Sequence, residues 1–264
     1  MTTATLSPRR AARIAGIGYL TIFVLAIFAN FFVVEALVES GDAAATAANI
    51  ADSEGMFRAG LVAFTVVFVL DVVIAWALFV LFRGTNRDLS LLAAWFRLTY
   101  TVLLGVGLVF FFVALRVITG SGFEGAASDA QVLLAIEAFE FAWLIGLVCF
   151  GAHLILLGRL AARSGEAPRA LGWVLAAAGS AYIADTLARA VLSDYASVEG
   201  LFLAIVAVPS VIGELWFTVW LLGRAGRSGP EAGLEAETAA PAALVGEARR
   251  DGGSAVAALR RPQA

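Results

Sequence analysis

The chain has 264 residues, of which 61% are hydrophobic and only 15% charged, and its mean hydropathy is +0.90. These values lie outside the usual range of soluble domains and predict an integral membrane protein whose main partner is the lipid bilayer. The net charge of −3, without any basic patch, excludes nucleic acid as an expected partner. The lone cysteine, Cys149, excludes an intrachain disulfide, and the lone histidine, His153, excludes bis-histidine haem ligation. We therefore expect no cofactor and no metal site.

Six apolar segments are each about long enough to cross a ~30 Å hydrocarbon core as a helix. We therefore expect an all-α fold, a polytopic transmembrane helical bundle formed by residues 1–222. The expected spans are 14–34, 57–82, 89–118, 130–158, 170–192 and 201–222. Residues 223–264 are rich in Gly, Ala, Pro and charge and lack aromatic side chains, so they predict a disordered cytoplasmic tail.

Local signals predict where several helices begin or bend. Ser7 followed by Pro8 is typical of an N-cap and a first helical position. Ser128 and Gln131 fit a capping box, which predicts the start of the fourth helix. Pro209 removes one backbone hydrogen bond within the sixth span and predicts a kink.

All 18 basic residues are arginine. The arginines outside the spans are concentrated at the N-terminus, in the second and fourth connections and at the start of the tail. By the positive-inside rule, both termini are expected in the cytoplasm, and the multi-pass chain in a bacterial plasma membrane. The arginines that support this topology are Arg9, Arg10, Arg13, Arg83, Arg87, Arg159, Arg163, Arg169, Arg224 and Arg227.

The first external connection, from Glu35 to Gly55, is the longest. Asp42 can cap a helix through the alanine-rich stretch that ends at Asp52, so a short extracytoplasmic helix is expected between spans one and two. We expect this segment to be an ordered lid over the charges below it. Arg58 would then hold an acid of the connection. A mobile acidic loop is the alternative.

The fourth segment is expected to be the central helix, because small or polar residues lie on two of its faces. A helix of this kind should be enclosed by neighbours, since a lipid-facing carboxylate is costly. One face carries Glu137, Glu140, Gly151 and Gly158, and the nearly opposite face carries Ala142, Gly146, Cys149 and His153.

Ionisable residues inside the spans fall into two layers, and each layer contains both signs. The candidate buried polar site consists of Asp71, Arg97, His153 and Glu214. The candidate outer polar layer consists of Glu137, Glu140, Asp185, Arg189 and Arg58, with Arg116 at a similar depth. Arg97 is expected to pair with Asp71 or Glu214, because an unpaired buried arginine is too costly.

These charges also have a structural interpretation. Residues near the interface, such as Arg116, Arg189, Glu137 and Arg58, can reach water by snorkelling. Asp185 and Arg189 are spaced for an ion pair within one helix. A lone histidine in an apolar helix, such as His153, is more often a hydrogen-bonded packing residue than a ligand.

Several motifs together resemble a bacterial family of six-span membrane proteins catalogued only as a domain of unknown function. The resemblance extends from about Arg13 to Leu222 and implies the fold and topology, but no substrate, cofactor or reaction. Its motifs are GDAAATAANI from Gly41 to Ile50, Phe57-Arg58, Phe96-Arg97-Leu98, GLVCFGAH from Gly146 to His153, PRALG from Pro168 to Gly172 and AYIAD from Ala181 to Asp185.

No motif of a soluble enzyme stands in a suitable context, so we expect no catalytic residues. Three functions remain open. We rank a non-enzymatic membrane protein first. The most concrete form of this hypothesis is a small-solute or proton-coupled transporter that uses the buried charges and binds a small molecule. The second is a membrane-embedded enzyme or cofactor-binding protein that uses His153 with acids. The third is a structural or sensory module.

Overall fold

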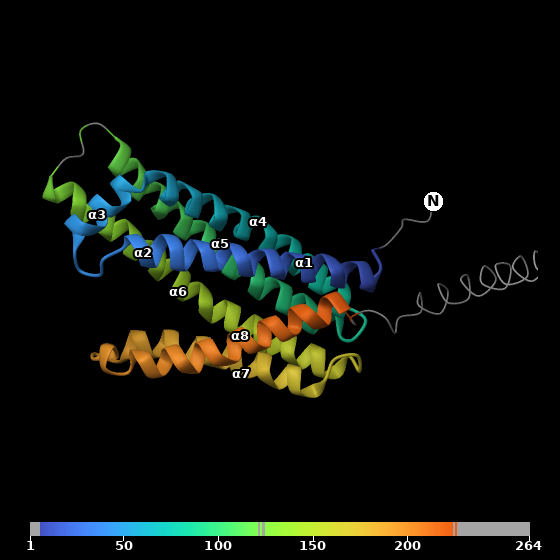
Figure 1. Ribbon diagram of the computed structural model, residues 1–264. Coiled ribbons are helices and arrows are strands. Elements are labelled where there is room, and N and C mark those ends of the chain that lie inside the picture. The colour runs from blue at the N-terminus through green and yellow to red at the C-terminus, as the bar shows by residue number, and fades with distance from the viewer. Residues whose placement is uncertain (1–5, 121, 123–124, 224, 226–264) are drawn as a thin grey trace, which may run out of the picture. The chain divides into compact units, whose positions relative to one another are not determined.

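The computed structural model describes residues 6–120, 122, 125–223 and 225, and this part of the chain contains helices and no strand (Figure 1). Six of the helices are long and apolar enough to cross a membrane. The prediction of an all-α bundle with six spans is therefore confirmed. Apart from Gly223 and Ala225, the expected tail lies outside the described residues.

Short connections join the helices in chain order (Figure 1). The first apolar segment is a continuous helix, because α1, η1 and α2 follow one another without a break from Pro8 to Leu37. The elements are α1 (Pro8–Ile27), the π-helix η1 (Phe28–Val34), α2 (Glu35–Leu37), α3 (Ala43–Asp52), α4 (Glu54–Phe82), α5 (Arg87–Thr119), α6 (Ala126–Arg163), α7 (Arg169–Val191), the 3-10 turn η2 (Tyr195–Ser197) and α8 (Glu199–Gly223).

Side-chain caps fix several helix starts. The Ser7 hydroxyl accepts a hydrogen bond from the Arg10 amide, with Pro8 in the first turn as predicted. The predicted start of the fourth helix was wrong. Helix α6 begins at Ala126, because Gly125 adopts a φ of 83° and its carbonyl already accepts the Ser128 amide at 2.8 Å. Ser128 therefore lies within the first turn instead of capping it.

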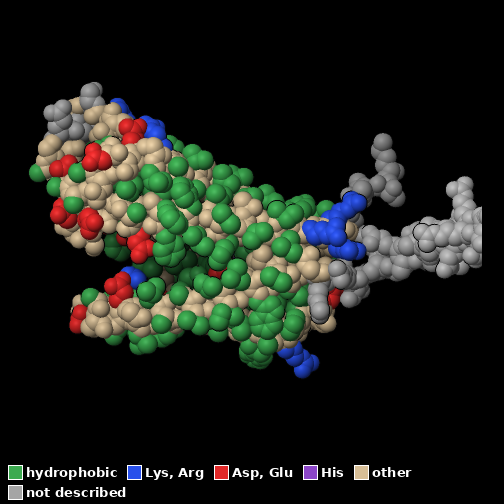
Figure 2. Space-filling model, in the orientation of Figure 1, with side chains coloured by type: hydrophobic (Ala, Val, Ile, Leu, Met, Phe, Trp, Pro, Cys, Tyr) green, Lys and Arg blue, Asp and Glu red, His purple; other side chains and the backbone are tan. Residues whose placement is uncertain are grey.

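The six long helices form a ring in which each packs on the next, with α1 also packing on α8 (Figure 1). Arginines gather at one end of this bundle and acidic residues at the other (Figure 2). We call these the arginine-rich end, with the connections around Arg83 and Arg163, and the acidic end, with the connection that contains α3. Near the acidic end, a hollow lies between α1 and the pair formed by α7 and α8 (Figure 2).

Helices α6 and α7 approach at the distance of backbone contact. A Cβ atom placed on Gly151, Gly158, Gly172 or Gly179 would lie closer than 3.0 Å to a backbone oxygen of the other helix. The opposite side of α6, which includes Gly146, packs on α5. The small residues on two faces of this helix therefore have the packing role that was expected of them.

The connection between α2 and α4 is ordered and packs mainly on α6. Asp42 caps α3 by accepting the Ala45 amide at 2.9 Å, and Ile50 is 0% exposed. The buried Thr46 hydroxyl accepts the Glu39 amide and donates to the Glu39 carbonyl. Helix α3 lines neither of the cavities described below, whereas Glu35, at the start of the connection expected from the sequence, lines one of them, so the expected lid stays a prediction.

Candidate functional site

Arg97 of α5 is the best-connected polar residue in the membrane-spanning part of the bundle. It is only 1% exposed, yet three other helices supply partners for its guanidinium. Its Nη2 donates to the Asp71 carboxylate of α4 at 2.5 Å, and its Nη1 donates to the Tyr19 hydroxyl of α1 at 2.6 Å. Its Nη1 also lies 3.3 Å from Nε2 of His153 in α6. The expected ion pair of Arg97 is therefore formed with Asp71.

The partners of His153 determine its proton position. Nδ1 lies 2.9 Å from the Ala93 carbonyl, which can only accept, and Nε2 faces the guanidinium of Arg97, which can only donate. The arrangement requires a neutral imidazole with its proton on Nδ1. Both ring nitrogens thus have a hydrogen-bond partner, and His153 helps to hold the Arg97 guanidinium in position.

Glu214 of α8 was expected at the same depth as this pair. Its carboxylate accepts a weak hydrogen bond from the Tyr182 hydroxyl at 3.5 Å. No described arginine lies within the ion-pair distance of 4.0 Å of it. The sequence offered Asp71 and Glu214 as alternative partners of Arg97, and the fold leaves Glu214 half-buried without a direct ion-pair partner among the described residues.

Glu214 and the Arg97–Asp71 pair line a common cavity of about 530 Å³, which we call the deep cavity. Aromatic and apolar side chains form most of its wall. Sequence reasoning missed its tyrosines and asparagine, because such residues in apolar helices are usually packing residues. These missed lining residues are Tyr19, Tyr100, Tyr182 and Asn30.

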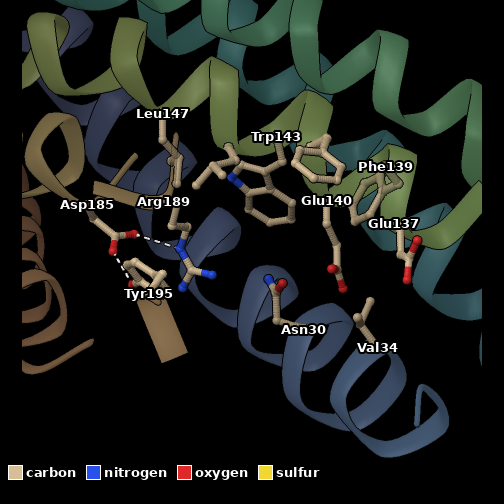
Figure 3. A pocket seen from close by; sticks show the side chains of 12 residues that line it. Asn30, Val34, Glu137, Phe139, Glu140, Trp143, Leu147, Asp185, Arg189 and Tyr195 are labelled. Atoms are coloured by element: carbon tan, nitrogen blue, oxygen red, sulfur yellow. Dashed lines mark hydrogen bonds and ion pairs between the residues drawn. The ribbon is translucent and has the colours of Figure 1, made fainter. Parts of the chain in front are cut away.

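A second cavity of about 670 Å³ lies at the acidic end, and we call it the acidic-end cavity (Figure 3). The predicted outer residues Glu137, Glu140, Asp185 and Arg189 all line it. Asp185 and Arg189 form the expected pair within α7 at 3.4 Å, and Arg189 also reaches Glu199 at 3.5 Å. In Figure 3, Glu140 and Arg189 point into the space that separates α6 and α7 from Asn30.

Tyr195 of η2 completes this group of charges. Its hydroxyl donates to the other oxygen of Asp185 at 2.5 Å, and the Arg189 guanidinium lies 4.2 Å from its ring centre (Figure 3). Burial, together with this hydrogen bond, raises the pKa of Tyr195 to about 12. The phenol is thus a constant donor at neutral pH, and it fixes the start of α8 to the end of α7.

The two cavities adjoin each other, since four residues line both: Asn30, Val34, Trp143 and Leu147. Asn30 and Val34 belong to η1. A π-helix is rare and is frequently found at functional sites. Here Asn30 projects toward Trp143 at the junction (Figure 3).

Not every predicted site residue joins these cavities. Arg58 lies outside both, at the start of α4, and pairs with Glu54 at 2.5 Å. It therefore holds an acid of the connection, but it is separate from Glu137, Glu140 and Asp185. Within the described ranges, no group of three His, Cys, Asp or Glu side chains could hold a metal ion.

The fold and the cavities together define the class of protein: a membrane protein with six long apolar helices and charged side chains in its interior. Residues 14–225 match a known protein family, which is described as Domain of unknown function (DUF4386). The chain belongs to this family. A relative from Archaeoglobus fulgidus, described as an uncharacterized protein, is 30% identical over 162 residues, which cover 61% of this chain and 81% of the relative. No solved structure matches the chain.

Proposed function

We propose that this protein is a proton-coupled transporter of a small, positively charged solute that binds beside Glu214 in the deep cavity. The observation that carries the proposal is the position of Glu214, on the cavity wall without an arginine partner. A carboxylate within the apolar part of a membrane protein is costly unless a proton or a cation neutralises it. A proton and a cationic solute would therefore compete for one group, which is the minimum requirement for exchange.

The Arg97–Asp71 pair has a different role in this proposal. Its two charges cancel, and Tyr19 and His153 hold the guanidinium in place. The pair therefore forms a fixed polar floor, and Glu214 remains the exchangeable carboxylate beside it. A cofactor role for His153 receives no support, because both of its ring nitrogens already have partners within the protein.

The packing of the arginine-rich end supports a cavity that opens in one direction. Tyr19 contacts Phe217 edge to face at 5.7 Å, and Phe217 and Phe82 both stack on Trp220. By the positive-inside rule this closed end would be cytoplasmic and the acidic end external. Inward opening would require movement of α8, in which Pro209 removes one backbone hydrogen bond about one turn before Glu214.

Exchange can be tested with the full chain in proteoliposomes. We would place a defined mixture of amino acids, polyamines and quaternary ammonium compounds outside vesicles with an acidic interior, and identify what accumulates by mass spectrometry. We expect at least one cation to accumulate in a manner that depends on the pH gradient. Glu214→Gln should abolish this accumulation, while Glu39→Gln, which changes an exposed acid of the connection, should not.

Two results would overturn the proposal. One is a wild-type protein that moves no member of the mixture. The other is equal accumulation by wild type and Glu214→Gln, since the exchange assigned to that carboxylate would then occur without it. Size-exclusion profiles and circular dichroism of each variant would establish that the bundle is folded.

A further inference from the structure

The deep cavity is open sideways, toward the region that lipid would occupy. Three of its lining residues keep much of their surface exposed: Ile27 37%, Phe31 61% and Val211 47%. Ile27 and Phe31 lie on the first helix and Val211 on α8. The cleft between these helices is visible as the hollow in Figure 2, with acidic and basic atoms inside it.

The cleft is confined to the acidic half of the bundle. Toward the arginine-rich end, α1 and α8 are in close contact, because a Cβ atom on Gly16 would lie 2.8 Å from the side chain of Leu222. The contact of Tyr19 with Phe217 closes the space just beyond. A molecule in the cleft would therefore have an apolar wall on both sides and a polar floor at its inner end.

That inner end has the composition of a site for an organic cation. Tyr100, Phe150 and Tyr182 form a row of rings, with centroids 4.9 and 5.7 Å apart, and the row ends at the Glu214 carboxylate. Aromatic faces attract desolvated cations, and tertiary or quaternary ammonium groups are bound in this way. A carboxylate at the end of such a row adds a full negative charge.

Two residues of the cavity wall each carry a buried polar atom without a hydrogen-bond partner. Among the described residues, Ser210 Oγ and Arg97 Nε have no hydrogen bond of normal geometry, although Ser210 lies close to Tyr182. Both residues line the deep cavity, and Ser210 is only 5% exposed. Buried polar groups without partners are rare in proteins. The Arg97 Nε–H is a donor that a cationic head cannot satisfy, so only the Ser210 hydroxyl can accept a hydrogen bond from such a head.

The charged residues that line the two cavities favour one sign of charge on the head group of a ligand. Their lining contains six carboxylates against two arginines, and both arginines pair with one of these acids, Arg97 with Asp71 and Arg189 with Asp185. An anionic head would meet an excess of like charge. The six acids are Glu35, Asp71, Glu137, Glu140, Asp185 and Glu214.

We infer that the deep cavity binds an amphiphilic organic cation, with its charged centre between Glu214 and the tyrosine row and its apolar body in the cleft between α1 and α8. This inference rests on the proposed function for the role of Glu214, and it names the class of solute. A neutral lipid chain would fill the cleft without using Glu214. A phosphate-bearing headgroup would be repelled by the acids.

The test uses two probes of the same shape and opposite charge, tetraphenylphosphonium and tetraphenylborate, in equilibrium dialysis against the purified full chain in detergent. We expect saturable binding of the cation at one site per chain and no saturable binding of the anion. Glu214→Gln should weaken cation binding by at least about tenfold, because it removes the charge partner in a partly desolvated site. Glu214→Asp, which keeps the charge, should retain binding, and so should the exposed-acid control Glu39→Gln.

A matched pair of substitutions tests the cleft itself. Ala26 lines the deep cavity, whereas Val24, two residues earlier on α1, is 59% exposed and does not line it. Ala26→Trp should lower cation affinity at least about tenfold by filling the cleft, and Val24→Trp should change it less than about twofold. Equal effects of the two changes would overturn the placement of the apolar body.

Failure of the inference is distinguishable from failure of the proposed function. Saturable binding of the anion as tight as that of the cation, or cation binding that survives Glu214→Gln, would overturn the inference. Exchange of a hydrophilic polyamine by a protein that does not bind tetraphenylphosphonium would also overturn it, yet would support proton-coupled transport. Binding that depends on Glu214, in a protein that moves nothing in vesicles, would support the inference and overturn transport.

Discussion

The Nη1 of Arg97 and the Nε2 of His153 meet at 3.3 Å, and the Ala93 carbonyl occupies the other side of the imidazole at 2.9 Å. His153 therefore ties the guanidinium of α5 to the backbone of the same helix through a side chain of α6. His153→Leu should lower the free energy of unfolding by about 1 to 3 kcal/mol, because the Ala93 carbonyl and Arg97 each lose a buried partner. His153→Gln, whose amide can both donate and accept, should lose less. Thermal unfolding of purified protein in detergent would rank the variants, and equal stability of His153→Leu and wild type would contradict this role.

The Arg97–Asp71 pair should show strong thermodynamic coupling. Arg97→Met or Asp71→Leu alone leaves one charge buried without its partner, and each should cost about 3 to 5 kcal/mol. The double variant Arg97→Met with Asp71→Leu should recover a large part of that loss, because no unpaired charge remains. A double-mutant cycle measured by unfolding in detergent would test this. Simple additivity of the two losses would count against the pairing.

This pair marks how far reasoning from the sequence alone could go. Depth and the cost of a lone charge predicted that Arg97 needs an acid from another span, and these arguments could be made without coordinates. They could not choose between Asp71 and Glu214, because that choice depends on the rotation of α4 and α8 about their axes. Small changes in packing set this rotation, and apolar helices carry little amphipathic signal to reveal it.

The parts of the site that were missed share a physical cause. Tyr19, Tyr100 and Tyr182 each lie in an apolar helix where an aromatic residue is most often a packing residue. Only the contact of Tyr19 with Arg97, the contact of Tyr182 with Glu214 and the position of Tyr100 on the cavity wall reveal a polar role. The π-helix over Phe28–Val34 contains no proline or glycine that would predict it. By contrast, the six long apolar helices follow from length and hydropathy, because the bilayer imposes them on any such chain.

Backbone contact between α6 and α7 predicts a strong dependence on side-chain size. Gly151→Ala should lower the free energy of unfolding by about 1 to 3 kcal/mol, since its Cβ would lie about 2.5 Å from the Gly179 carbonyl oxygen. Gly55→Ala is the matched control, because nothing lies within 4 Å of a Cβ at that position in the first turn of α4. Unfolding curves of both variants in one detergent would check the difference. A loss for Gly55→Ala as large as that for Gly151→Ala would refute the close-packing account.

The division of the bundle into an arginine-rich and an acidic end predicts its orientation. By the positive-inside rule, a reporter fused after Leu222 should be cytoplasmic and one inserted near Ala45 should be external. Paired reporters, one active only inside the cell and one only outside, would measure both positions in the same host. Detection of both positions on the same side would overturn the topology with six spans.

The last prediction concerns α3, whose docking depends on a few buried contacts. Thr46 is 0% exposed, and its hydroxyl makes two hydrogen bonds to the backbone of Glu39, 3.0 Å as acceptor and 3.1 Å as donor. An alanine-rich helix of ten residues is not stable alone in water, so its order must come from docking. Amide exchange of residues 43–52 should therefore be slow in wild type.

Thr46→Val keeps the shape of the side chain and removes both hydrogen bonds, so it should accelerate exchange throughout α3 by about tenfold or more, corresponding to a loss of roughly 1 to 3 kcal/mol. Asp42→Ala removes only the cap and should have a smaller effect of about 1 kcal/mol. Thr99→Val is the matched control, since that exposed threonine donates only to a carbonyl within its own helix. Exchange in nanodiscs, read by mass spectrometry, would test all three variants. Rapid, complete exchange of α3 in the wild-type protein would show instead that the connection is a mobile acidic loop.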